Sequence, residues 1–353
     1  MASVCLNMIV KDEARVIRRC LDSVRPFIDS WVIVDTGSTD GTQDLIRRAL
    51  ADLPGELHER PWKNFGHNRS EALALARDKA DYLLVIDADE ELVAEPGFSM
   101  PELTVEQYMV LYRLRESPVS WYRATLIRTS LPWRYEGVLH EYLECGRPAS
   151  SQKLFGLSIR SYSDGARNEN PREKYANDAR TLEEGLRDEP GNTRYVFYLA
   201  QSYRDSEQLE RAIETYERRA ALGGWAEEVW YSLFQIAVLE QRCGHDFARV
   251  LHAYLRAYQY RPTRAEPLCA LATHYRGTQE WALAELFARG AAAIARPDDI
   301  LFVDESVYEW RALDELAIAT YYTGKFAEAA ALNRRLLDEG KLPESERKRR
   351  ERA

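Results

Sequence analysis

Apolar runs alternate with helical patterns along the first 165 or so residues, and this alternation constrains the fold more than any other feature. The runs VCLNMIV (4–10), SWVIVDTGS (30–38) and ADYLLVIDAD (80–89) are rich in β-branched and aliphatic residues, as strands are. EARVIRRCLDSV (13–24) and TQDLIRRALAD (42–52) carry apolar residues at helical spacing. Strands this apolar are covered on both faces. The pattern predicts an α/β domain with a mostly parallel sheet between helices.

Shorter alternating stretches continue up to about residue 165, among them QYMVLYRL (107–114) and YRATLIRT (122–129). We expect these to add mixed or antiparallel strands to the sheet. After Asn170-Pro171 the strand pattern ends, and Ala, Leu, Glu, Arg and Tyr dominate at helical spacing. The sequence therefore predicts two domains, an α/β domain over 1–168 and an all-α domain over 169–353.

The helical half contains a degenerate repeat. Segments 198–220, 270–292 and 316–337 each show a helix of small residues with a Tyr near its end, a polar turn and a second helix. Tyr203 and Tyr275 lie 72 positions apart, which is twice a 36-residue unit. This spacing resembles tetratricopeptide repeats, in which each helical pair buries its apolar face against its neighbours. We expect a short curved solenoid.

Composition limits the partners and the compartment. The net charge of −9 argues against a nucleic-acid partner, because phosphate binding needs a surplus of Lys and Arg on one surface. The five cysteines are widely spaced and form no Cys-x-x-Cys pair, so free buried thiols are expected. No segment approaches the roughly 20 apolar residues of a transmembrane helix, and run 4–10 is too short for a signal peptide. A cytoplasmic protein is the simplest expectation.

The segment VIDADEEL carries the strongest chemical pattern, an apolar strand that ends in acidic residues. Side chains at i and i+2 of a strand point to one side, about 7 Å apart, so Asp87 and Asp89 could share one divalent cation. Carboxylate ligands favour Mg²⁺ or Mn²⁺, which neutralise a departing diphosphate. An acidic turn that caps the next helix would give the same pattern.

A second polar cluster, VDTGSTDGT, lies at the end of the strand of residues 30–38. Asp35 closes that strand, Gly37 and Gly41 permit a tight backbone, and Ser38 or Thr39 can cap the next helix. A carboxylate here could accept hydrogen bonds from a nucleobase or a ribose. An ordinary strand-to-helix turn uses the same residue types.

Several stretches together, in this order and spacing, resemble the family 2 glycosyltransferases with the nucleotide-sugar-binding GT-A fold. They are SVCLNMIVKDEARVIRRCLDSV, VIVDTGSTDGTQDLI and FGHNRSEALALARDKADYLLVIDADEEL, and they are continued by LPWRYEGVLHEYL. The resemblance covers roughly residues 1–165. The step into helical repeats is similar to a bacterial subgroup with a tetratricopeptide-like C-terminal half.

The resemblance implies roles for particular residues. Asp35 would read the base, Asn7 would line the base pocket, and Arg69 would lie near the nucleotide. Asp87 and Asp89 would form the metal-diphosphate motif, and His140 would complete the metal site. Family resemblance also suggests an inverting reaction with a general base. Of Glu90, Glu91, Glu136 and Glu141 we favour Glu90, because it directly follows the metal motif.

The sequence thus predicts a metal-dependent glycosyltransferase with Mn²⁺ or Mg²⁺ as cofactor. Its donor would be a nucleoside-diphosphate sugar, most simply UDP-linked. Its acceptor, a protein or peptide or an envelope saccharide, would be oriented by the repeats. One alternative is an inactive helical-repeat interaction scaffold. The other is a sugar nucleotidyltransferase, but NMIVKDEAR at the first strand is not the Gly-rich, basic loop expected for a triphosphate.

Overall fold

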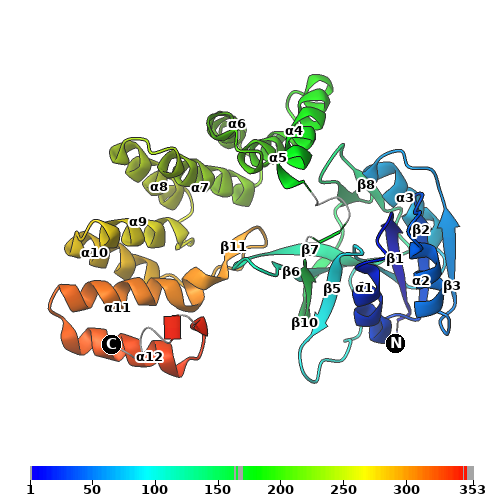
Figure 1. Ribbon diagram of the computed structural model, residues 1–353, viewed down its shortest axis with the longest axis horizontal. Helices are drawn as coiled ribbons and strands as arrows, with labels where there is room; N and C mark the ends of the chain where they lie inside the picture. Colours follow the sequence, from blue (N-terminus) through cyan, green and yellow to red (C-terminus); the bar gives the residue numbers. More distant parts are fainter. Residues whose placement is uncertain (1, 163, 166–169, 345, 348–353) are drawn as a thin grey trace. The chain divides into compact units, whose positions relative to one another are not determined.

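The computed structural model describes residues 2–162, 164–165, 170–344 and 346–347 (Figure 1). Strands and helices alternate up to Val85, strands alone follow up to Ser161, and beyond that residue the described elements are helices apart from one short strand, which confirms the predicted fold class. The chain divides into two compact units, Met1–Glu207 and Gln208–Ala353. The predicted seam between residues 168 and 169 lies outside the described residues. The division by compactness keeps the first helical pair with the sheet.

The first unit contains one mixed sheet and a small two-stranded sheet. In the mixed sheet the strand order is β3-β2-β1-β4-β7-β6-β10-β5. Strands β3, β2, β1 and β4 are parallel neighbours, whereas β7 runs antiparallel to both β4 and β6. The strand bounds are β1 (Val4–Val10), β2 (Ser30–Asp35), β3 (Gly55–Glu59), β4 (Tyr82–Val85), β5 (Glu90–Ala94), β6 (Gln107–Leu114), β7 (Val119–Arg128), β8 (Arg134–Glu136), β9 (Tyr142–Glu144) and β10 (Ser151–Ser161).

Alternate side chains of the central strands supply two separate cores. Leu6 and Met8 of β1 pack with Ile17 and Leu21 in a core that includes α1 (Ile17–Val24) and α2 (Thr42–Ala49). Cys5, the residue before Leu6, points to the other face and joins the opposite core, which contains α3 (Phe65–Ala76). Burial on both faces explains why the parallel strands are continuously apolar. A 3₁₀ turn (Arg25–Phe27) follows α1.

Side-chain caps fix where several helices begin. Asn64 accepts a hydrogen bond from the backbone N–H of His67 (2.8 Å), and α3 begins one residue after Asn64. Asn170 caps α4 (Pro171–Asp188), whose first residue is a proline, and Asn192 caps α5 (Thr193–Asp205). A short polar side chain at this position satisfies backbone donors that the helix leaves open. The caps thereby set where α3 and α4 start relative to the sheet.

The second unit consists mainly of helices, each packed against the next along the chain (green to red in Figure 1). This nearest-neighbour packing is that of a helical solenoid. A two-residue strand, β11 (Val303–Asp304), and a π-helical turn (Val307–Arg311) interrupt the repeat. The helix bounds are α6 (Leu209–Ala221), α7 (Ala226–Arg242), α8 (Phe247–Tyr260), α9 (Glu266–Gly277), α10 (Trp281–Ala292), α11 (Ala312–Tyr322) and α12 (Phe326–Asp338).

Across the described part of the chain, no helix combines the length and the apolar character that crossing a bilayer requires.

Candidate active site

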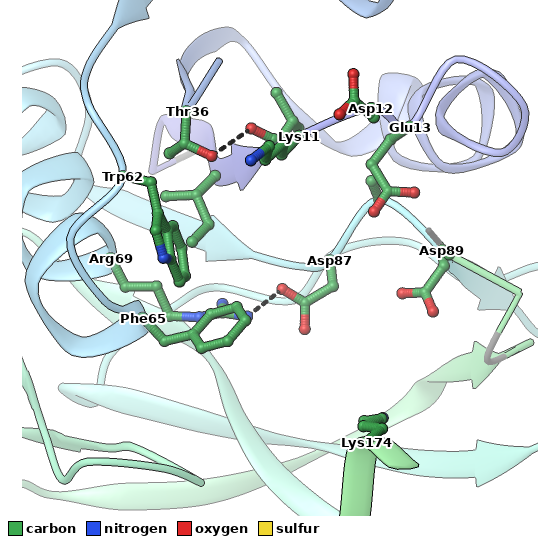
Figure 2. A pocket seen from close by; sticks show the side chains of 14 residues that line it. Lys11, Asp12, Glu13, Thr36, Trp62, Phe65, Arg69, Asp87, Asp89 and Lys174 are labelled. Atoms are coloured by element: carbon green, nitrogen blue, oxygen red, sulfur yellow. Dashed lines mark hydrogen bonds and ion pairs between the residues drawn. The ribbon is translucent and has the colours of Figure 1, made fainter. Parts of the chain in front are cut away.

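A cavity of about 660 Å³ lies in the first unit where three parallel strands end (Figure 2). It adjoins the carboxyl ends of β1, β2 and β4, which is where open α/β sheets bind ligands. Its size is within the range of small-molecule sites. The lining residues are Ile9, Val10, Lys11, Asp12, Glu13, Thr36, Trp62, Phe65, Arg69, Asp87, Ala88, Asp89, Gly165 and Lys174.

Asp87 and Asp89 both line this cavity, but they do not extend a strand as the sequence pattern predicts. β4 ends at Val85, so the two aspartates lie in the turn between β4 and β5. The turn is closed by a hydrogen bond from the backbone N–H of Glu90 to the carbonyl of Asp87 (3.1 Å). Arg19 Nη2 donates to the carbonyl oxygen of Asp89 (3.1 Å) from helix α1. Tertiary contacts therefore present this acidic turn to the cavity.

Asp87 is held by two arginines. Arg69 Nη2 donates to its Oδ1 (2.6 Å), and Arg123 Nη1 lies 3.7 Å from its Oδ2. Burial disfavours the charged form of Asp87, but the two guanidinium groups outweigh burial and keep its pKa below the ordinary value. The Arg69 side chain is 17% exposed; burial lowers its pKa, but the Asp87 carboxylate outweighs burial and raises the pKa. Asp87 is therefore an ionised, oriented acceptor.

Asp89 has a different environment. Burial and the neighbouring charge of Asp87 raise its pKa. Its Oδ2 and both carboxylate oxygens of Glu13 lie 3.3 Å from the point that a Cβ on Gly165 would occupy. Two carboxylates thus converge on one small space that a glycine leaves open, and Figure 2 shows both at the cavity. Hard oxygen donors arranged in this way suit Mg²⁺ or Mn²⁺.

Glu90 faces the protein interior and is not among the lining residues. It is 4% exposed, and its Oε2 accepts hydrogen bonds from the Asp87 N–H (3.0 Å), Tyr112 (2.9 Å) and Arg123 (3.0 Å). Burial, together with the charge of Asp87, raises its pKa to about 8, although Arg123 opposes the rise. This position does not support the role of general base, and it makes Glu90 a support of the acidic turn.

Asp35 does not itself line the cavity, but it ends β2 just before the lining residue Thr36. It is 1% exposed, and its Oδ1 accepts hydrogen bonds from the backbone N–H groups of Gly37 and Ser38 (2.9 Å each). Gly37 has a φ of +107°, which disfavours residues with a side chain. The buried Oδ2 of Asp35 accepts no hydrogen bond from any described residue. A buried acceptor without a donor is costly, so this oxygen is suited to a ligand donor.

Asn7 does not line the cavity. It is 2% exposed within β1, and its Nδ2 donates to the carbonyl oxygens of Val32 (3.2 Å) and Ala72 (2.9 Å). These bonds join β1 to β2 and α3. The position of Asn7 therefore indicates a structural amide rather than a contact to a base.

His140 is also outside the lining of the cavity. Its backbone has a φ of +50°, its ring stacks on Tyr198 of α5 at 3.9 Å, and its carbonyl oxygen accepts a hydrogen bond from Arg194 (3.0 Å). The neighbouring residue Glu141 packs at the start of α3, with its Cγ 3.7 Å from the point that a Cβ on Gly66 would occupy. The structure thus brings together Arg69, Asp87 and Asp89, but not His140.

Sequence reasoning missed several lining residues. Glu13 comes soon after the first strand, and its place at the carboxyl end of β1 is the signal that could have identified it. Trp62 and Phe65 form an edge-to-face pair at 4.7 Å on the side of Arg69 (Figure 2). Lys174 belongs to α4, beyond the predicted seam. Phe65 begins the quoted stretch FGHNRSEAL, but no motif marks Trp62 or Lys174, because the paths of loops and helix packing bring these two residues to the cavity.

Known proteins resemble the chain in both halves. The family profile described as Glycosyl transferase family 2 matches residues 5–95. A TPR repeat-containing protein of Synechococcus elongatus is 30% identical over 84% of this chain and 76% of its own length. The SPbeta prophage-derived glycosyltransferase SunS of Bacillus subtilis is 24% identical over 60% of this chain and 52% of its own length.

Solved structures of helical-repeat proteins overlap about half of the chain. The MamA protein superimposes with a TM-score of 0.38 at 18% identity, over 51% of this chain and 96% of MamA. A tetratricopeptide repeat protein from Parabacteroides merdae gives a TM-score of 0.36 at 18% identity, over 48% of this chain and 61% of its own. The relatives, the matched profile and the α/β unit lead to one assignment. The chain belongs to glycosyltransferase family 2, with a family 2 domain followed by helices that resemble tetratricopeptide repeats.

Proposed function

We propose that the cavity binds a nucleoside-diphosphate sugar together with Mn²⁺ or Mg²⁺ and transfers the sugar to an acceptor. The observation that carries this proposal is the convergence of the Asp89 and Glu13 carboxylates beside Gly165, in a cavity at the carboxyl ends of parallel strands. A divalent ion in that space would neutralise both carboxylates and the diphosphate.

Two features support a nucleotide as the ligand. The indole of Trp62 and the ring of Phe65 offer apolar faces to a base or a ribose at one side of the cavity. The Oδ2 of Asp35 is a buried acceptor without a donor among the described residues, next to the lining residue Thr36, which suits the N–H group of a uracil. We therefore propose that the donor is a UDP-linked sugar.

The remaining polar groups would have different roles at the proposed site. Asp89 and Glu13 would hold the cation, and Asp87, oriented by Arg69, would accept hydrogen bonds from sugar or ribose hydroxyls. Lys11 and Lys174 line the same cavity and can balance phosphate charge. The bound cation would supply charge neutralisation of the leaving diphosphate. Neither Glu90 nor His140 is included, because Tyr112 and Arg123 hold the Glu90 carboxylate in the interior and the His140 ring stacks on Tyr198.

We propose that the helical repeats bind the acceptor, a protein or peptide or an envelope saccharide. Aromatic side chains are exposed on this unit, including Tyr321 (55%), Tyr322 (57%) and Phe326 (61%). Tyr321 contacts both of its neighbours in this set edge to face. Such a cluster can pack against peptide side chains or stack on sugar rings.

The test is release of nucleoside diphosphate from a panel of nucleotide sugars, with and without Mn²⁺. We expect slow metal-dependent release from a UDP-sugar even without an acceptor. Asp89→Asn should lower this rate by about 100-fold or more, because it removes a charged cation ligand. Asp44→Asn is the matched control, since the Asp44 side chain is 69% exposed on α2, and it should leave the rate unchanged.

Other results would point to the alternative functions. Release of pyrophosphate from a nucleoside triphosphate and a sugar phosphate would indicate a nucleotidyltransferase. If no nucleotide sugar binds or turns over in the presence of metal, the family 2 domain acts as a scaffold and the proposed activity is refuted.

A further inference from the structure

The turn between α7 and α8 in the helical unit holds a cysteine and a histidine in fixed positions. α7 ends with Cys243 as its C-cap, and Gly244 comes next with a φ of +73°. The N–H of His245 donates to the carbonyl of Glu240 (3.1 Å), and that of Gly244 donates to the carbonyl of Gln241 (3.1 Å). These two bonds are those of a Schellman motif, which fixes the backbone of the turn.

Three ligand-type side chains meet beside this turn. They are Cys243, His245 and Glu210, which lies in the first turn of α6. One ligand atom from each lies within 4.8 Å of the other two. His245 Nε2 is 3.2 Å from a carboxylate oxygen of Glu210. The side chains of Glu210 and His245 are 65% and 27% exposed, so an ion can reach them from solvent.

The other nitrogen of His245 is held by a buried carboxylate. Its Nδ1 bonds to Oε2 of Glu240, which is 2% exposed, and Oε1 of Glu240 accepts from Arg249. A carboxylate that accepts a hydrogen bond from Nδ1 fixes the ring and leaves the lone pair of Nε2, which lies 3.2 Å from Glu210, available to a metal ion. Metal-binding histidines are commonly held in this way, by a carboxylate on the ring nitrogen that does not bind the metal. Glu240 is therefore a positioning residue and not a ligand.

We propose that Cys243, His245 and Glu210 bind a transition-metal ion, with Zn²⁺ as the ion of choice. Thiolate, imidazole and carboxylate are all zinc ligands, and three protein ligands leave the fourth tetrahedral position to water. The ligand set carries two negative charges once the thiol is deprotonated, which balances the ion. The metal would connect the first turn of α6 to the α7–α8 turn and stabilise the helical unit. This site is separate from the cavity of the first unit and does not depend on the proposed function.

Titration of the full-length protein with Zn²⁺ and with Co²⁺ tests the site. We expect one Co²⁺ equivalent to produce a sulfur-to-metal charge-transfer band in the near ultraviolet, and Zn²⁺ to displace it. That band reports a thiolate ligand, and the other four cysteines are buried. A cation held only by carboxylates in the cavity cannot give rise to this band. Zn²⁺ should also raise the melting temperature, because it binds the folded state.

Variants assign the ligands. Cys243→Ser should abolish the band, and His245→Gln should weaken Zn²⁺ binding by at least about tenfold. Glu240→Gln should weaken binding by about 10–100-fold through His245 alone, with the band retained at high Co²⁺. His252→Gln, an exposed histidine on α8, is the matched control and should bind as the unaltered protein does. Absence of a thiolate band, or Zn²⁺ binding unchanged in both Cys243→Ser and His245→Gln, would overturn the proposal.

Discussion

Two carboxyl groups in the acidic turn, two residues apart, have their pKa values moved in opposite directions. Arginine contacts lower the pKa of Asp87 against the effect of burial, whereas burial and the charge of Asp87 raise that of Asp89. Such a split separates the roles of neighbouring acids. The protein thus balances the charge of Asp87 with its own arginines. It leaves negative charge at Asp89, where we propose a cation.

Filling the space beside Asp89 tests that role without altering any charged group. A Cβ on Gly165 would lie 3.3 Å from oxygens of Asp89 and Glu13. We expect Gly165→Ala to raise the Mn²⁺ concentration for half-maximal turnover by about tenfold, which corresponds to about 1.4 kcal/mol. Melting temperature should change little. Gly191→Ala is the control, because a Cβ there meets nothing within 4 Å. Equal effects of the two substitutions would argue against a cation at this point.

Glu90→Gln distinguishes a general base from a support of the acidic turn. Loss of a base would remove transfer to the acceptor but leave acceptor-independent donor hydrolysis and metal affinity intact. Glu90 accepts hydrogen bonds from the Asp87 N–H, Tyr112 and Arg123, so its replacement should disturb the acidic turn. We therefore expect the rates of hydrolysis and transfer to fall together, by about 10–100-fold, and activation by Mn²⁺ to weaken. Nucleoside diphosphate release over a Mn²⁺ series measures both effects. Normal hydrolysis with lost transfer would restore Glu90 as the base.

At the scale of elements, hydrogen bonds and ion pairs between neighbouring helices strengthen the repeats. Glu285 of α10 shows this arrangement. It accepts hydrogen bonds from Arg289 on its own helix (2.8 Å), from Thr323 after α11 (2.7 Å) and from Lys325 before α12. Burial alone would raise the pKa of Glu285, but these donors lower it to about 2. One carboxylate thereby connects three successive helices.

This depressed pKa predicts acid sensitivity of the helical unit. An unfolded glutamate has a pKa of about 4.3, so the stabilisation by Glu285 is complete above about pH 5 and is lost as the pH falls toward 2. We expect Glu285→Gln to lower the free energy of unfolding by about 1–2 kcal/mol at pH 7, after allowance for solvent screening, and by little near pH 2. Urea unfolding followed by circular dichroism at both pH values measures this.

Glu328→Gln is the matched control for Glu285→Gln. Glu328 pairs with the same Arg289, but its side chain is 37% exposed, so its loss should cost less at every pH. A destabilisation by Glu285→Gln that is the same at pH 2 and pH 7 would show that charge is not its cause.

The elements were more predictable from sequence than the site. Apolar runs predicted strands at 4–10 and 30–38, and the structure contains β1 and β2 there, because burial on both faces leaves a direct trace in composition. Helix 13–24 begins later than predicted, at Ile17. The orientation of the Glu90 side chain depends on Tyr112 and Arg123, and that of the His140 side chain depends on Tyr198. These partners are distant in sequence. Motif spacing carries no information about such contacts.

At the scale of the whole molecule, the helical pattern begins before the first compact unit ends. Helices α4 and α5 look like part of the repeat in sequence, yet the compact unit extends to Glu207 and includes them. Lys174 of α4 lines the cavity, and the hydroxyl of Tyr195 in α5 accepts a hydrogen bond from the Val138 N–H (3.3 Å). The first helical pair therefore belongs to the same folded body as the sheet, and it supplies part of the lining of the cavity.

Two fragments with different ends test where the functional unit stops. A fragment of residues 1–207 retains both cores of the sheet, α4 and the contact between Tyr195 and Val138, so we expect it to fold cooperatively and to bind UDP in the presence of Mn²⁺ within about threefold of the full chain. A fragment of residues 1–168 lacks Lys174 and both helices, and we expect it to bind at least about tenfold more weakly. Isothermal titration with UDP, together with a thermal melt of each fragment, measures affinity and folding separately. If the shorter fragment is folded and binds as tightly as the longer one, α4 contributes nothing to the site, and the boundary that the sequence pattern indicates near residue 168 is the functional one.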